Sequence, residues 1–183
     1  AGVSDAAIAT SSPLGSGPLM LLARTDRPKP APGEETRSIF RAVSPEYFRT
    51  LKIHVVRGRE FSDRDVAGAP RVAIINQVAA RRLFGDEDPI GRDVELLDSP
   101  RASRWTRRPG IARIVGIASN VKEVGVHEVE FADIYLPYAQ APSPSIEFVL
   151  RTAVPLNTLR EPAQKAIAAA DPANPVTRMA AFT

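Results

Sequence analysis

A chain of 183 residues, of which 44% are hydrophobic and 25% charged, has the composition of a globular protein and is long enough for one domain or two small ones. Its 24 basic and 21 acidic residues are spread along the whole length, and the net charge of +3 is too even to favour nucleic acid as a partner. The sequence contains no cysteine, which excludes disulfides, thiolate metal sites and cysteine nucleophiles.

No run of about 18 to 20 apolar residues occurs, and no basic start followed by an apolar core predicts a signal peptide. Because the chain begins at Ala1 without a methionine, we interpret it as a piece of a longer protein. Its elements in order are many strands with few short helices and no regular alternation, which indicates an α+β fold with mixed sheets.

The first part of the chain predicts strands separated by an exposed loop. A strand is expected at residues 8–12, and the proline-rich, charged segment 24–36 is expected to be a loop. Alternation in TRSIFRAV predicts a second strand at 36–43, and KIHVVRG predicts a third at 52–58.

Between the second and third strands, the sequence VSPEYFRTL predicts a short helix. Ser44 is the expected N-cap, and Pro45 fits the first helical position. Tyr47, Phe48 and Leu51 then form an apolar face that we expect to pack against the neighbouring strands. This pattern indicates scaffolding rather than a reaction site.

The middle of the chain contains the clearest helix. The segment 71–75, RVAII, predicts a buried strand, and an amphipathic helix follows, with Asn76 as N-cap and Gly85 as C-cap. Pro89 and Gly91 then predict a turn into another strand, with a positive φ at Gly91.

Segment 101–110 is expected to be the tip of a hairpin. It carries the only tryptophan of the chain and four arginines: Arg101, Arg104, Trp105, Arg107 and Arg108. These residues predict contact with an anionic lipid surface, or stacking on a base, and the simpler interpretation is a solvated tip.

The last part predicts strands at 133–140 and 145–153 and a helix at about 157–170. Pro162 lies too deep in this helix for a first-turn proline, so a late start or a kink is expected.

No motif predicts catalysis or cofactor binding. His54 and His127 are far apart and lack the spacing of a metal site. The acidic segments 63–65 and 86–88 lack the spacing of a calcium loop, so turn and helix-start roles explain them. Neither a phosphate-binding glycine motif nor a nucleophile elbow is present. We therefore expect no catalytic, cofactor or metal site.

Four blocks of sequence occur in a fixed order. They are VSPEYF at 43–48, FSDRD at 61–65, NQVAARRLFGDEDPIG at 76–91 and VGIASNVKEVG at 115–125. Together they closely resemble the MacB-like periplasmic core domain of FtsX-type ABC transporter permeases. More narrowly, they resemble the orphan permeases of that group, which lack a fused ATPase. The resemblance covers nearly the whole chain.

The resemblance implies two subdomains. A porter-like α/β subdomain is expected from about 1–58 and 143–183, without its usual first strand and helix. A mostly β subdomain is expected to be inserted at about 59–142. The helix with Tyr47 and Phe48 then forms a structural junction between the two.

The resemblance also implies a place on the extracytoplasmic, periplasmic side of the bacterial inner membrane, as part of a membrane protein. We expect a non-enzymatic domain that couples membrane-helix motion to export or to mechanical signalling. The expected partners are the membrane helices of the same chain, a separate ATPase subunit, and a second permease copy or a periplasmic protein. The alternative is a module that binds a substrate or peptide in a cleft between the subdomains. No cofactor or nucleic acid is expected.

Overall fold

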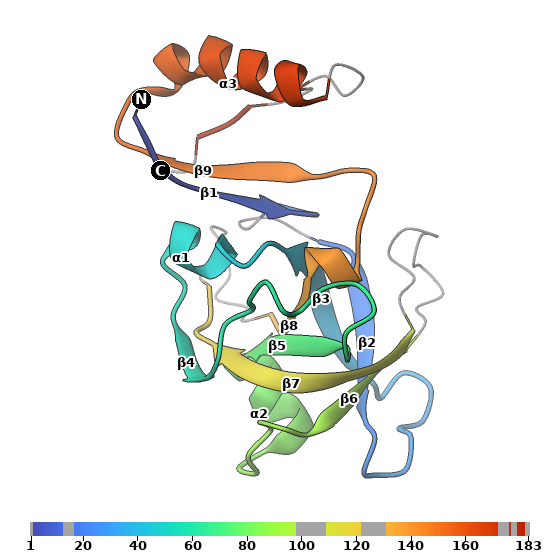
Figure 1. Cartoon of the computed structure of the whole chain (residues 1–183). Coiled ribbons are helices and arrows are strands. Elements are labelled where there is room, and N and C mark those ends of the chain that lie inside the picture. Colours follow the sequence, from blue (N-terminus) through green and yellow to red (C-terminus); the bar gives the residue numbers. More distant parts are fainter. Residues whose placement is uncertain are drawn as a thin grey trace. The chain divides into compact units, whose positions relative to one another are not determined.

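The computed structural model describes residues 2–12, 17–97, 109–121, 131–171, 176 and 179–181. The chain forms two compact units, a smaller one made of Ala1–Asp5 with Leu150–Thr183 and a larger one made of Ala6–Val149. Figure 1 labels the elements other than η1. In chain order they are β1 Val3–Ala9, β2 Leu19–Arg24, β3 Thr36–Val43, α1 Tyr47–Leu51, β4 Val55–Gly58, β5 Val72–Asn76, α2 Gln77–Phe84, β6 Asp93–Leu97, β7 Gly110–Ala118, β8 Asp133–Pro137, the 3-10 helix η1 Tyr138–Gln140, β9 Glu147–Thr152 and α3 Leu156–Ala170.

Strands of the larger unit close into a barrel (Figure 1). β2 pairs with β6, and the ring continues through β7, β5, β8 and β3, which pairs again with β2. β3 is parallel to β8 and β5 is parallel to β7, whereas the other pairs in the ring are antiparallel. This mixed sheet with few short helices confirms the predicted α+β class.

The interior of the barrel is filled from alternate positions of its strands, because successive side chains of a strand point to opposite faces. The strand residues of this first core are Met20, Leu22, Phe40, Ala42, Ala73, Ile75, Val94, Leu96, Ala112, Ile114, Ile134 and Leu136. Val78, Ala79 and Phe84 of α2 belong to the same core. α2 therefore packs against the barrel strands β3, β5, β7 and β8.

A second core lies beneath α1, against the other face of the sheet. Tyr47 and Phe48 are 1% and 0% exposed, and their rings meet edge to face with 5.7 Å between centroids. Phe48 also contacts Tyr135 of β8 at 5.2 Å and Phe61 at 5.9 Å. The predicted burial of both α1 rings is therefore observed, and β8 is covered on both faces.

α1 begins later than predicted. Its first residue is Tyr47, Glu46 occupies the N-cap position, and no side chain caps the helix. The Ser44 hydroxyl instead accepts a hydrogen bond from the Ile8 backbone N–H at 3.1 Å. Ser44 N–H donates in turn to the Ile8 carbonyl at 2.9 Å. The prediction of Ser44 as N-cap is therefore wrong, because its hydroxyl and its N–H are both hydrogen-bonded to Ile8 of β1.

α2 agrees with the prediction at both ends. The Asn76 side-chain oxygen accepts a hydrogen bond from Ala79 N–H at 2.9 Å, and Gly85 is the C-cap with φ of 60°. Both caps depend on residues within one turn of the helix ends, which is why the local sequence is sufficient to predict them.

β2 is not among the predicted strands, and β1 starts earlier than expected, at Val3. Leucine and methionine favour helix over strand as isolated residues, and a proline-rich loop follows the LMLLA run. Pairing of β2 with β3 on one side and β6 on the other overrides that preference.

The smaller unit contains α3 with the ends of β1 and β9. Thr152 Oγ1 donates to the Gly2 carbonyl at 2.8 Å, which joins the two strand ends. α3 starts at Leu156 and contains Pro162, so of the two expected outcomes the late start is wrong and the kink stays a prediction. Pro162 is solvent-exposed, and of the predicted apolar stripe only Leu159 is buried.

The expected subdomain boundaries, at 58/59 and 142/143, stay a prediction, and both positions lie within the larger compact unit. In that unit β3 pairs with both β2 and β8 in the barrel, so residues 36–43 belong with the strands that follow them. Within the described parts of the chain, no helix is long and apolar enough to cross a membrane.

Candidate functional site

Among the predicted site residues, Pro89 and Gly91 lie in the turn between α2 and β6. Gly91 has φ of +78°, as predicted. Its N–H donates to the Ile114 carbonyl at 2.8 Å, which fixes the turn against β7. The hairpin residues all lie outside the described parts of the chain; these are Arg101, Arg104, Trp105, Arg107 and Arg108.

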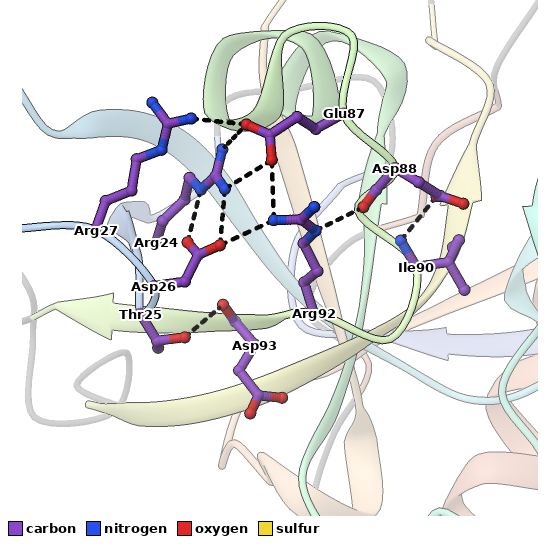
Figure 2. Close-up of polar contacts among 9 residues, drawn as sticks. All are labelled: Arg24, Thr25, Asp26, Arg27, Glu87, Asp88, Ile90, Arg92 and Asp93. Carbon is purple, nitrogen blue, oxygen red and sulfur yellow. Dashed lines mark hydrogen bonds and ion pairs between the residues drawn. The ribbon is translucent and has the colours of Figure 1, made fainter.

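A cluster of charged side chains lies beside this turn, and the sequence analysis does not predict it (Figure 2). Its members come from the end of β2, from the loop that follows β2, and from the turn before β6. We call it the Arg24 network, and it comprises the side chains of Arg24, Asp26, Arg27, Glu87 and Arg92 with the backbone carbonyl of Asp88.

Arg24 is the centre of the network, and its side chain is 7% exposed. Its Nε and Nη2 donate to the two carboxylate oxygens of Asp26 at 2.8 and 2.7 Å. Its Nη1 and Nη2 donate to the two oxygens of Glu87 at 2.7 and 3.1 Å. The guanidinium carbon also lies 4.8 Å from the centroid of the Phe84 ring. The flat, forked guanidinium suits this double bidentate pairing over a ring.

Two further arginines complete the network (Figure 2). Arg92 Nη1 lies 2.9 Å from both Asp26 Oδ2 and Glu87 Oε2, and Arg92 Nε donates to the Asp88 carbonyl at 2.9 Å. Arg27 Nη2 donates to Glu87 Oε1 at 2.7 Å. The Asp26 and Glu87 carboxylates are therefore surrounded by guanidinium groups.

This arrangement shifts the acid–base equilibria of its members. Hydrogen bonds from Arg24 lower the pKa of Glu87 to about 2 and hold the pKa of Asp26 well below its usual range. The same hydrogen bonds, to Asp26 and then Glu87, raise the pKa of Arg24. Such carboxylates remain ionised at neutral pH and are weak bases. The network therefore acts as a structural link between two chain segments, residues 24–27 and 87–92.

The loop after β2 is attached at further points along β6. Thr25 Oγ1 donates to the Asp93 carbonyl at 3.1 Å, and Lys29 Nζ donates to Glu95 Oε1 at 2.8 Å. In the turn itself, Asp88 Oδ1 accepts from Ile90 N–H at 3.1 Å. The acidic segment 86–88, expected to serve a turn, does so and also binds the loop.

A second polar cluster is buried at the start of β8. Arg41 forms an ion pair with Asp133, and their side chains are 2% and 7% exposed. Asn76 Nδ2 donates to Asp133 Oδ2 at 3.0 Å, and Asn76 Oδ1 accepts from Asp133 N–H at 3.0 Å. The Asp133 charge opposes the effect of burial and raises the pKa of Arg41. Asn76 therefore caps α2 and also binds β8.

Neither cluster contains a metal-binding arrangement. In the parts of the chain that the structure describes, no group of three or more histidine, cysteine, aspartate or glutamate side chains could hold a metal ion. The sequence signal that could have revealed the Arg24 network is the pair of mixed-charge segments, RTDR and DEDPIGR, each next to an apolar run.

Comparison with protein families gives one match over most of the chain. The family described as the MacB-like periplasmic core domain matches residues 5–176. Macrolide export ATP-binding/permease protein MacB 2 of Aeromonas hydrophila is 25% identical over 97 residues. That alignment covers 53% of this chain and 13% of the curated protein, so the chain spans only a small part of its length.

Solved structures share the fold. The periplasmic region of MacB from Actinobacillus actinomycetemcomitans has a TM-score of 0.61 at 15% identity, and the match covers 92% of this chain and 68% of that one. The extracellular domain of the noncanonic ABC-type transporter YknZ from Gram-positive bacteria has a TM-score of 0.57 at 17% identity, covering 95% and 79%. A domain of a permease protein from Porphyromonas gingivalis has a TM-score of 0.55 at 16% identity, covering 100% and 81%.

Proposed function

The chain belongs to the MacB-like periplasmic core domain family, and from this premise we propose that it is the extracytoplasmic domain of an ABC transporter permease. In this role it lies on the periplasmic side of the inner membrane and couples motion of membrane helices to export or to mechanical signalling. The observation that carries the proposal is the family match over residues 5–176.

The partners follow from the same proposal. The membrane helices belong to the full-length chain, and the ATPase is a separate subunit, as in the permeases without a fused ATPase that the sequence resembles. A second permease copy or a periplasmic protein receives the motion outside the membrane. We propose no catalytic step for this domain, which acts by changing position when the helices move.

The internal structure of the larger unit supports a relay. Its barrel has a closed ring of hydrogen-bonded strands, and the Arg24 network fixes the loops at β6. Packed interiors of this kind move as rigid bodies rather than deforming continuously. The chain passes between the two units twice, within β1 and within β9. A rigid unit attached by strands is suited to transmitting displacement.

The test uses engineered disulfides in the complete permease. Because the chain contains no cysteine, one introduced pair forms the only disulfide in this domain. Pairs with one cysteine in each compact unit are screened for cross-linking, and export is then measured in the oxidised and reduced states. We expect oxidation to abolish export while ATP binding by the ATPase persists, and reduction to restore export.

A matched pair provides the control. Leu21 of β2 and Leu97 of β6 are directly opposed in the antiparallel register, and both lie in the larger unit. A disulfide between cysteines at these positions does not join the two units, so export should continue after oxidation. Full export with the two units locked would contradict the relay and would leave the binding of a substrate or peptide as the role of the domain.

A further inference from the structure

The loop that connects β2 to β3 is longer than the connection requires. β2 and β3 are antiparallel neighbours, with Leu22 opposite Thr36. Neighbours of this kind are usually joined by about two to five residues. Residues 25–35, here named the proline loop, carry prolines at positions 28, 30 and 32. All of this loop is exposed except for half-buried Pro30 and Glu35.

Local chemistry restricts the conformation of this loop. From Arg27 to Pro32, every residue is either a proline or the residue before one. The proline ring fixes φ, and the residue before proline is pushed out of the helical region, so the segment favours an extended polyproline II conformation. With three residues per turn, Pro28 and Ala31 share one face of this helix, and both are exposed.

The body of the protein holds the first part of the loop through several polar contacts. Asp26 and Arg27 are bound in the Arg24 network (Figure 2). Thr25 and Lys29 are bound to β6. The charges of Arg27 and Lys29 are thereby paired within the protein. Pro28 and Pro32 are exposed and lie beside these paired side chains, whereas the Ala31 carbonyl accepts a hydrogen bond from Glu34 N–H at 2.9 Å.

We propose that the proline loop is a docking element for a partner domain with a groove lined by aromatic side chains. Pyrrolidine rings pack on flat aromatic rings, and tyrosine or tryptophan donors in such a groove bind the carbonyls. Binding needs little ordering of the loop, because prolines and the Arg24 network fix it beforehand. This inference is independent of the relay, since a passive domain could dock in the same way.

The first experiment places a photoreactive benzoylphenylalanine at Ala31 of the full-length protein, in the cells that naturally produce it. The same residue at Ala67, which is also exposed but in another loop, is the matched control. We expect Ala31 to give a discrete adduct with one other protein and Ala67 to give none. Absence of an adduct at Ala31, or the same adduct from both positions, overturns the proposal.

The second experiment tests the chemistry of recognition. A peptide with the sequence of residues 25–35 is added in excess, alongside a peptide in which its three prolines are alanine. We expect the native peptide to remove the adduct and the alanine peptide to be about tenfold weaker, because it loses the fixed conformation. Equal competition by the two peptides, or by neither, contradicts docking through the prolines. The cross-linked site on the partner should also map to aromatic residues.

A variant of the chain completes the test. In Pro28→Ala/Pro30→Ala/Pro32→Ala, we expect the adduct to fall by about tenfold. The urea midpoint of the variant shows whether the fold is intact, and the peptide competition does not depend on the variant folding. An undiminished adduct in a folded variant overturns the proposal.

Discussion

Beneath α1, distant segments are held together by ring packing, whereas at the end of β2 they are held by matched charges. Phe48 contacts rings from β8 and from the loop after β4, and its exposure is 0%. Arg24 instead contacts Asp26 and Glu87 through paired hydrogen bonds, and Glu87 is 36% exposed. Both regions fix loops to the same barrel, but one excludes water and the other remains in contact with it.

In the larger unit, stability and loop geometry therefore have different sources. Apolar burial is non-directional and contributes in proportion to the area removed from water. Charge pairing at a surface contributes less free energy because solvent screens it, but it specifies distances and angles. We therefore expect substitutions beneath α1 to unfold the barrel and substitutions in the Arg24 network mainly to release the loops.

The largest effect is expected for Phe48→Ala. Removing this ring leaves a cavity in a well-packed cluster, and the free energy of unfolding should fall by about 3 to 5 kcal/mol. Chemical denaturation measures the change. Phe148→Ala is the matched control, because this ring is 47% exposed, and its effect should be below about 1 kcal/mol. Similar losses of unfolding free energy in the two variants would show that the burial of the ring does not determine the size of the effect.

Asp133→Asn tests a charged cluster that is buried like the α1 core. The substitution removes the Asp133 charge from its ion pair with Arg41, whose side chain is only 2% exposed. We expect the free energy of unfolding to fall by about 3 kcal/mol, within the range for a broken buried pair. Asp93→Asn removes the half-buried partner of exposed Arg113 and should leave the denaturation midpoint nearly unchanged. An unchanged midpoint for Asp133→Asn would show that the buried charge pair does not stabilise the fold.

Sequence reasoning succeeded where the determining residues are neighbours. Asn76 and Gly85 lie at the two ends of α2, and the rings at Tyr47 and Phe48 follow a turn signal directly. The turn at Gly91 is predictable for the same reason. Each of these features depends on a few consecutive residues and their backbone preferences.

Sequence reasoning failed where the interacting residue is distant in the sequence. Arg24 and Glu87 are separated by 63 positions, and nothing near either residue specifies the other. β2 forms because β3 and β6 flank it, although its leucines and methionine favour a helix. Serine is a common N-cap residue, but the Ser44 hydroxyl accepts a hydrogen bond from Ile8 N–H instead. Only the closed barrel brings these pairs together.

Gly91→Ala should reduce stability by a smaller amount, and it tests the backbone of the turn beside the Arg24 network. Its φ of +78° is unfavourable for residues with a Cβ, although a Cβ would meet no atom within 4 Å. We expect a loss of about 1 kcal/mol from backbone strain alone. Gly91→Asn should cost less, because asparagine tolerates this region better. Denaturation midpoints that place asparagine below alanine would contradict the explanation.

The smallest effect is expected for Glu87→Gln, and its dependence on pH distinguishes the network from the apolar core. The pKa of Glu87 falls from 4.5 to about 2 on folding, mainly through the Arg24 hydrogen bonds, so the unfolded chain binds more protons between these values. The stabilising contribution is therefore complete above about pH 4.5 and is lost as the pH falls toward about 2. Urea midpoints of native and Glu87→Gln protein should differ near about pH 6 and converge near about pH 2. Asp26 titrates in both proteins, so its contribution cancels to a first approximation.

High salt should also reduce the difference between the urea midpoints of native and Glu87→Gln protein near neutral pH, because Glu87 is 36% exposed. The corresponding gap for Phe48→Ala should persist at every pH, since no titrating group is removed. A Glu87 gap that is independent of both pH and salt would show that the side chain acts by packing, and the contrast between the two regions would then be wrong.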